Sequence, residues 1–278
     1  MKLELHCHTD YSRAAQVLYD GVDSPDAIVR AAKQKGLGGI VITDHNTLLG
    51  IPDSKKAGRK YGVLVIAGEE ISSRDGDITA YGISEVVRPG LSAEETIDRV
   101  HAQGGVATSV HPFDIKGIGL KEKCVLTDCV EVFNSLCIDR FSNRMAHMFA
   151  TKRKLNMVAG SDAHCVEMVG NGVTIVNADT EESILRALRT GKTALETRYA
   201  PIFDIKNLAM KRLSISNDHT MNYIMNNYHG PKKFVSKKMM RMVGYDETRL
   251  NGLFNLLAYL SLYSAVGYGF ARNVGRGL

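Results

Sequence analysis

The chain has 278 residues, of which 44% are hydrophobic and 23% are charged, as in an ordinary soluble globular protein. This length suits one large α/β domain, or a domain with an appendage. The five cysteines form no Cys-x-x-Cys pair, and their odd number argues against a disulfide framework. Because residues 1–10 also lack the apolar segment of a secretory signal, we expect a cytoplasmic protein.

The positive charge is concentrated near the C-terminus. The net charge is +5, but residues 206–278 hold 11 basic and 3 acidic side chains, so that residues 1–205 carry a net charge of −3. An acidic N-terminal part favours cation binding, and a basic C-terminal part favours partners that carry phosphate groups. An ordinary solvated surface would show the same charge pattern.

Short apolar strands alternate with helices over most of the chain. Ser24-Pro25 is a typical helix start, and Ser92-x-x-Glu95 is a capping box that predicts another. We predict strands over residues 2–7, 39–43, 63–67, 106–110, 129–133, 156–159 and 172–176, with a hairpin over 71–83. We predict helices over residues 25–36, 53–61, 94–103, 139–153 and 181–190. The alternation is typical of a parallel sheet that helices cover on both sides.

Beyond about residue 200 the alternation stops, and residues 217–278 are predicted to be helical with a break at Gly230-Pro231. Residues 250–271 contain no charged side chain, although Asn and Ser residues dilute the run. We interpret this run as a core helix or an oligomer-interface helix rather than a membrane span. The sequence therefore argues against membrane contact and leaves the oligomeric state open.

Histidines and acids follow the predicted strands, at the edge where active sites of parallel β/α barrels form. These side chains are His6, His8, Asp44, His45, Glu69, Glu70, His111, Glu131, Asp162 and His164. Clustered carboxylates repel one another, so this collection needs cations. Mixed imidazole and carboxylate ligands favour Mn²⁺, Zn²⁺ or Fe²⁺, and their number predicts two or three ions.

Five segments together resemble the PHP (polymerase and histidinol phosphatase) family. They are His6-Cys7-His8-Thr9 with Ser12, Thr43-Asp44-His45-Asn46, Gly68-Glu69, His111-Pro112 and Gly160-Ser161-Asp162-Ala163-His164. The resemblance implies a distorted seven-stranded β/α barrel and hydrolysis of phosphate esters at a site of up to three metal ions. We expect this domain over residues 1–200 and a basic, mostly helical appendage of unassigned role over residues 201–278.

The resemblance also implies roles for individual residues. His6, His8, Glu69 and Asp162 would hold one ion, Glu69 would bridge to a second ion shared with His111, and His45 and His164 would hold a third. The chain departs from the family pattern at Asp77, which would still bind an ion where relatives often carry His, and after Ser12, where Asp10 or Asp20 would have to substitute for a missing ligand. By strand alternation, Glu70 is expected to point away from the site.

These residues lead to a functional hypothesis: a phosphoesterase that hydrolyses phosphomonoesters or phosphodiesters with a metal-activated water. The resemblance is strongest to small stand-alone enzymes that act on nucleotides or short nucleic acids. His164 or His45 would protonate the leaving group if the third ion is absent, and Arg13 would contact the phosphate.

Two alternatives to this hypothesis remain open. One is a small-molecule phosphatase of the histidinol-phosphate type. The other is a catalytically silent metal-binding module that tethers nucleic acid or a membrane through the basic C-terminal region.

Overall fold

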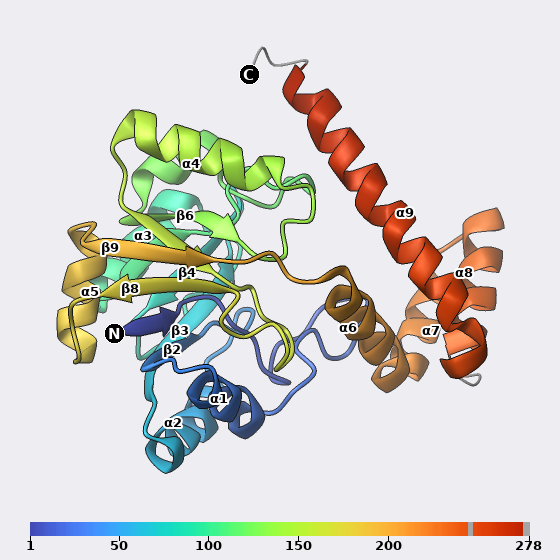
Figure 1. Cartoon of the computed structure of the whole chain (residues 1–278), viewed down its shortest axis with the longest axis horizontal. Helices are drawn as coiled ribbons and strands as arrows, with labels where there is room; N and C mark the ends of the chain where they lie inside the picture. Colours follow the sequence, from blue (N-terminus) through green and yellow to red (C-terminus); the bar gives the residue numbers. More distant parts are fainter. Residues whose placement is uncertain (244–246, 275–278) are drawn as a thin grey trace.

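The strands of this protein form one sheet that curls into a nearly closed barrel (Figure 1). The computed structural model describes residues 1–243 and 247–274. Within these ranges there are nine strands: β1 (Lys2–Glu4), β2 (Gly39–Ile42), β3 (Leu64–Ser72), β4 (Asp77–Tyr81), β5 (Val106–Ser109), β6 (Cys129–Asn134), β7 (Met157–Gly160), β8 (Gly172–Val176) and β9 (Thr193–Thr197). Their order is β7-β6-β5-β4-β3-β2-β1-β8-β9, and β7 packs against β8 and β9, which brings the two ends of the sheet together.

The predictions of seven strands and of a parallel sheet were both wrong. The pairs β1–β2, β2–β3, β5–β6 and β6–β7 are parallel, whereas β3–β4, β4–β5, β1–β8 and β8–β9 are antiparallel. The tight turn after β3 requires an antiparallel partner, so β4 enters the barrel as a full strand. Strand β9 was missed because its side chains are mostly exposed and carry no continuous apolar run.

Helices pack around the barrel much as the sequence predicts. They are α1 (Pro25–Gln34), α2 (Ile51–Tyr61), α3 (Ala93–Ala102), α4 (Phe141–Arg153) and α5 (Glu181–Arg189), with a short 3₁₀ helix over Lys121–Leu126. The predicted caps are confirmed: Ser24 Oγ accepts a hydrogen bond from the Ala27 amide, and Ser92 and Glu95 form a reciprocal capping box. The apolar faces of the helices bury the outer side of the strands, and Leu3, Val41 and Ile66 lie in a further buried cluster.

The C-terminal helices extend to one side of the barrel (right in Figure 1). They are α6 (Ile202–Ile215), α7 (Asn217–Asn227), α8 (Gly230–Val243) and α9 (Glu247–Val274). The predicted break at Gly230-Pro231 matches the gap between α7 and α8, whereas residues 244–246 and 275–278 of the predicted helical region lie outside the described residues. Of the two alternatives predicted for residues 250–271, the core helix is wrong, because only 6% of the Gly252–Ala271 segment of α9 is buried; the oligomer-interface helix stays a prediction.

The five cysteines are free thiols, and burial raises the pKa of each of them. For Cys124, Cys129 and Cys165 the pKa rises to about 12. Because the thiolate is the reactive form, these side chains remain unreactive near neutral pH.

We therefore predict that the native protein reacts slowly with Ellman's reagent at pH 8, and that the rate increases only as the pH rises toward the raised pKa values. The same protein in guanidinium chloride should release thionitrobenzoate from all five thiols at once. Rapid reaction of several thiols in the native protein at pH 8 would contradict this assignment.

Candidate metal centre

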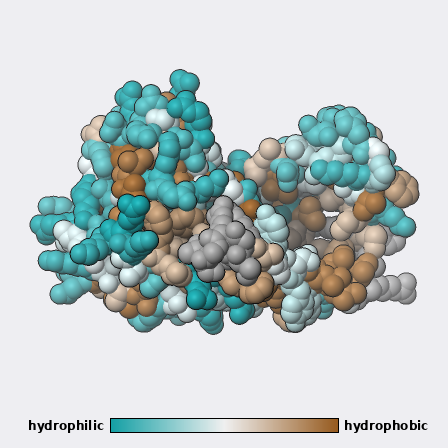
Figure 2. All heavy atoms as spheres, turned by 90° about the horizontal axis from the view of Figure 1, so that it is seen from above, coloured by the Kyte–Doolittle hydropathy of each residue, from teal (hydrophilic) through white to brown (hydrophobic). Residues whose placement is uncertain are grey.

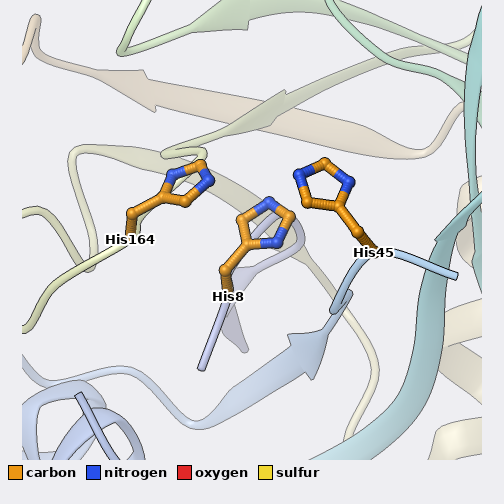
Figure 3. Close-up of side chains that lie close together, drawn as sticks. All are labelled: His8, His45 and His164. Atoms are coloured by element: carbon orange, nitrogen blue, oxygen red, sulfur yellow. The ribbon is translucent and has the colours of Figure 1, made fainter. Parts of the chain in front are cut away.

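The barrel brings histidines from four separate segments to one place. His6 and His8 follow β1, His45 follows β2, His111 follows β5 and His164 follows β7. The imidazole rings of His8 and His164 stack with centroids 4.1 Å apart, and the His8 and His45 centroids are 4.7 Å apart (Figure 3). Side chains separated by up to 156 positions in the sequence thus face one another, as the sequence analysis predicts.

Glu70 lies at the centre of this group and is almost fully buried. Its Oε2 atom is 3.3 Å from Nε2 of His6, 3.3 Å from Nε2 of His8 and 3.2 Å from Nδ1 of His45. Its Oε1 atom is 3.1 Å from Nε2 of His111. Burial alone would raise the pKa of Glu70, but the surrounding histidines hold it well below its usual range. One carboxylate therefore links four imidazoles.

The prediction that Glu69 faces the site and Glu70 faces away was wrong. Strand β3 continues to Ser72, well beyond its predicted end, so both glutamates lie within a strand and point to opposite sides. Glu69 accepts a hydrogen bond from the Val87 amide at 2.9 Å, away from the histidines. Burial raises the pKa of Glu69 to about 7. The Glu69 side chain therefore lies on the side of β3 that faces away from the histidines, where it has a structural role.

Two acids complete the cluster at its edges. Asp20 Oδ2 is 2.8 Å from Nε2 of His164 and 3.2 Å from Nε2 of His45, so Asp20 takes the position that the sequence leaves open between Asp10 and Asp20. Asp77 groups with Glu70 and His111. Burial, followed by the nearby Glu70 charge, raises the pKa of Asp77 to about 6.

The ligand atoms fall into four overlapping groups of three, each with all atoms within 4.8 Å of one another. These groups are His6 with His8 and Glu70; His6 with His111 and Asp162; Glu70 with Asp77 and His111; and His8 with His45 and His164. The predicted ligands His6, His8, His45, Asp77, His111, Asp162 and His164 thus come together, and Glu70 replaces Glu69. Overlapping groups fit more than one ion.

The chemistry of His8 tests whether a metal ion fits here. Its Nε2 atom is buried and has no directed hydrogen bond among the described residues, although two carboxylates approach it to 3.3 Å. Burial, followed by the neighbouring His164, lowers the pKa of His8 to about 3. A neutral imidazole with a buried, unused nitrogen is the form that binds metals, so the donor set fits divalent cations.

Residues behind the cluster hold the ligands in place. Ser12 Oγ is 3.2 Å from Nδ1 of His8, and Glu131 Oε1 is 3.0 Å from Nδ1 of His6. Asp44 accepts two hydrogen bonds from Thr9, and so fixes the loop after β1 rather than a histidine. Such contacts orient metal ligands and set the tautomer of each imidazole.

The backbone is strained at two of the ligands. Asp162 has a φ of 53° and His111 has a φ of 30°, both in the left-handed region that such side chains rarely adopt. Strain of this kind is concentrated at functional sites, where the surrounding structure enforces it.

A cavity of about 320 Å³ opens in front of the cluster. Its floor includes Asp20, His45, Glu70, His111, Asp162 and His164, and its walls include isoleucines and leucines from the loops after β5 and β6 and from α6. The residues that line it include two cations, Lys116 and Arg212. Acids outnumber these cations in the lining, so an anionic end of a ligand would lie beside Lys116, Arg212 or metal ions held by the cluster, and an apolar end would contact the apolar walls.

Arg212 is a site residue that the sequence analysis missed, and Arg13 does not lie where it was predicted. Arg212 projects from α6, and its Nη2 atom lies 2.9 Å from Oδ1 of Asp20. Arg13 is exposed; it donates to the Leu18 carbonyl and stacks on the Tyr19 ring outside the cavity. No local motif marks Arg212, because only the fold brings α6 beside the loop that carries Asp20.

Comparisons with known proteins agree with this picture. A family model described as PHP-associated matches residues 140–193. An uncharacterised protein of Methanocaldococcus jannaschii is 38% identical over 152 residues, which cover 52% of this chain and 89% of that protein. The PolC-type DNA polymerase III of Oceanobacillus iheyensis is 42% identical over 74 residues, which cover 27% of this chain and only 5% of the polymerase.

A solved structure has a similar fold. It is a two-domain protein of Bacteroides vulgatus that contains a predicted PHP-like metal-dependent phosphoesterase. It superposes with a TM-score of 0.56 at 20% sequence identity, over 76% of this chain and 69% of the solved chain. At this level of identity the likeness supports the fold.

The two neighbouring glutamates allow a matched test of the cluster. We predict that Glu70→Gln weakens Mn²⁺ binding, measured by isothermal titration calorimetry, by about tenfold or more, because the central carboxylate is lost. Glu69→Gln should bind Mn²⁺ like the wild type, since its carboxyl lies on the far side. Equal affinities in the two variants would contradict the central position of Glu70.

Proposed function

Because this chain belongs to the PHP (polymerase and histidinol phosphatase) family, we propose that it is a metal-dependent phosphoesterase that hydrolyses phosphomonoesters or phosphodiesters. The observation that carries the proposal is the buried Glu70 carboxylate with four imidazoles around it at the floor of a cavity that two cations line. Imidazoles and acids provide metal ligands, and the cations attract an anionic substrate.

Three sets of side chains would hold the ions. His6, His8, Glu70 and Asp162 form the first set; Glu70, Asp77 and His111 form the second; Asp20, His45 and His164 form the third. Divalent ions in such sites neutralise phosphate charge and lower the pKa of a bound water. The donor types suit Mn²⁺, Zn²⁺ or Fe²⁺.

The side chains that line the cavity would bind and orient the substrate. We assign phosphate binding to Arg212, because it lines the cavity and its buried Nη2 atom, ion-paired with Asp20 at 2.9 Å, makes no directed hydrogen bond among the described residues. Lys116 would add a second positive charge. His45 and His164 face the cavity and remain our candidates for giving a proton to the leaving oxygen when the third set holds no ion.

This assignment changes the role that we expect for the C-terminal region. We still place the phosphoesterase domain over residues 1–200, but α6 contributes Ile205, Leu208 and Arg212 to the cavity wall. Within residues 201–278, α6 would therefore complete the pocket of that domain.

A nucleotide or a short nucleic acid is the substrate class that we favour. The apolar walls of the cavity can contact a base, while the phosphate lies near Arg212 and the metal ligands. A histidinol-phosphate-type substrate is the alternative, since its small ring and phosphate would also fit this arrangement.

We predict that EDTA abolishes phosphoesterase activity and that Mn²⁺ restores it, because the reaction needs ions at the Glu70 cluster. The assay would compare kcat/KM for p-nitrophenyl phosphate, nucleoside monophosphates, a dinucleotide and histidinol phosphate. We expect the highest value with a nucleotide substrate. A higher value with histidinol phosphate would favour the alternative, and no turnover with any metal would favour a silent binding module.

A second prediction tests the assignment of phosphate binding to Arg212 instead of Arg13. Arg212→Met should raise KM for the best phosphate ester by roughly 10- to 100-fold, because a charge-assisted hydrogen bond to the phosphate is lost. Arg13→Met is the matched control and should leave kcat and KM unchanged. The reverse result, in which only Arg13→Met impairs the enzyme, would restore the sequence-based assignment.

A further inference from the structure

Helix α9 exposes apolar side chains along the face that points away from the protein. Leu253, Leu256, Leu260, Tyr263 and Tyr268 are 41%, 56%, 54%, 70% and 58% exposed. They recur every three to five positions, so they share one side of the helix. Figure 2 shows hydrophobic surface on this part of the molecule, which lies on the right in both views.

Other positions of α9 make the contacts with the rest of the chain, although Tyr259 and Phe270 among them are themselves 38% and 59% exposed. Asn255 accepts a hydrogen bond from Lys206 of α6, and the Tyr259 ring meets the Phe203 ring edge-on. Farther along, Phe270 packs near Phe141 of α4. The helix is thus anchored while its leucine-rich face remains in water, the reverse of the usual orientation of a surface helix. Such a face marks a binding surface.

The neighbouring helix α8 adds positive charge and further apolar side chains. Lys232, Lys238 and Arg241 are exposed on α8, and so are Phe234 and Val235, at 71% and 52%. Mixed cationic and aromatic or aliphatic side chains are typical of helices that lie in the interface of an anionic membrane. Arg249 and Arg272 flank the apolar stretch of α9 in the sequence and extend this pattern.

The charge selects among the possible occupants of this surface. In a symmetric pair of chains, two regions that each carry a net charge of +8 would face each other and repel. A nucleic acid would match the charge but would leave the leucines of α9 in water. The surface of a bilayer that contains anionic lipids satisfies both features at once.

We propose that α8 and α9 form a docking surface for anionic membranes, with the outward face of α9 buried among the lipids and the cations of α8 at the head groups. The docking is peripheral, because the inner face of α9 stays on α6 and α4. This inference reverses the sequence-based expectation against membrane contact, and it does not depend on the phosphoesterase activity.

The test is vesicle flotation of the full chain with phosphatidylcholine alone and with added phosphatidylglycerol. The wild type should float with the anionic vesicles and bind neutral ones weakly. The triple variant Leu256→Ser/Leu260→Ser/Tyr263→Ser and the double variant Lys232→Glu/Lys238→Glu should each lower the partition coefficient by about tenfold or more.

Matched controls come from α2 and the loop before it, on the barrel. Leu49→Ser removes a leucine that is 72% exposed, and Lys55→Glu/Lys56→Glu reverses two exposed charges; neither should change flotation. Circular dichroism and Mn²⁺ binding would show that every variant folds.

Three results would overturn the proposal. In the first, the wild type fails to bind anionic vesicles, or the serine variant binds them as well as the wild type does. In the second, sedimentation velocity shows that the wild type is a dimer and that the serine variant is a monomer, which would assign the surface to a second copy. In the third, the chain binds single-stranded oligonucleotides but no vesicles, and only the lysine variant loses that binding.

Discussion

The burial of one carboxylate among four imidazoles is the constraint on which this structure depends. Removing Glu70 from water costs several kcal/mol, which only nearby positive charge offsets. Its partners come from the ends of separate strands, so the compensation forms only when the barrel has closed. The strained backbones of Asp162 and His111 show that the fold enforces this arrangement against local preference. The arrangement that makes the centre difficult to bury also supplies the mixed imidazole and carboxylate donors that suit divalent cations.

The sequence predicts which types of residue form the centre better than it predicts which side chains point into it. The strand ends that carry His6, His8 and Asp162 follow from apolar runs that stop at polar residues, and the barrel brings these ends together. The choice between Glu69 and Glu70 rested on the resemblance to the PHP family. Because successive side chains of a strand point to opposite sides, an error of one residue in that assignment puts the wrong glutamate at the centre. The pattern of apolar residues also does not reveal the number of strands, because an exposed strand at the end of the sheet, such as β9, has no apolar pattern.

Contacts between residues that are far apart in the sequence are harder still to predict. Arg212 follows Asp20 by 192 positions, and no spacing rule connects them; only the packing of α6 against the barrel does. The apolar stretch of α9 illustrates a related limit. Its composition shows that these side chains avoid water, but it does not show which partner covers them. A core, a second chain and a lipid surface would all favour the same leucines.

Helix α6 has a consequence for how such an enzyme can diversify. The hydrolytic centre is built from residues 6–164, whereas part of the wall that a bound molecule meets comes from a helix beyond residue 200. The ligands of the centre therefore come from one stretch of the gene, whereas the cavity wall draws on both that stretch and the later one. Recombination that exchanged the distal stretch would alter which molecules fit the cavity, but it would also remove Arg212, so the new stretch would need another cation beside Asp20.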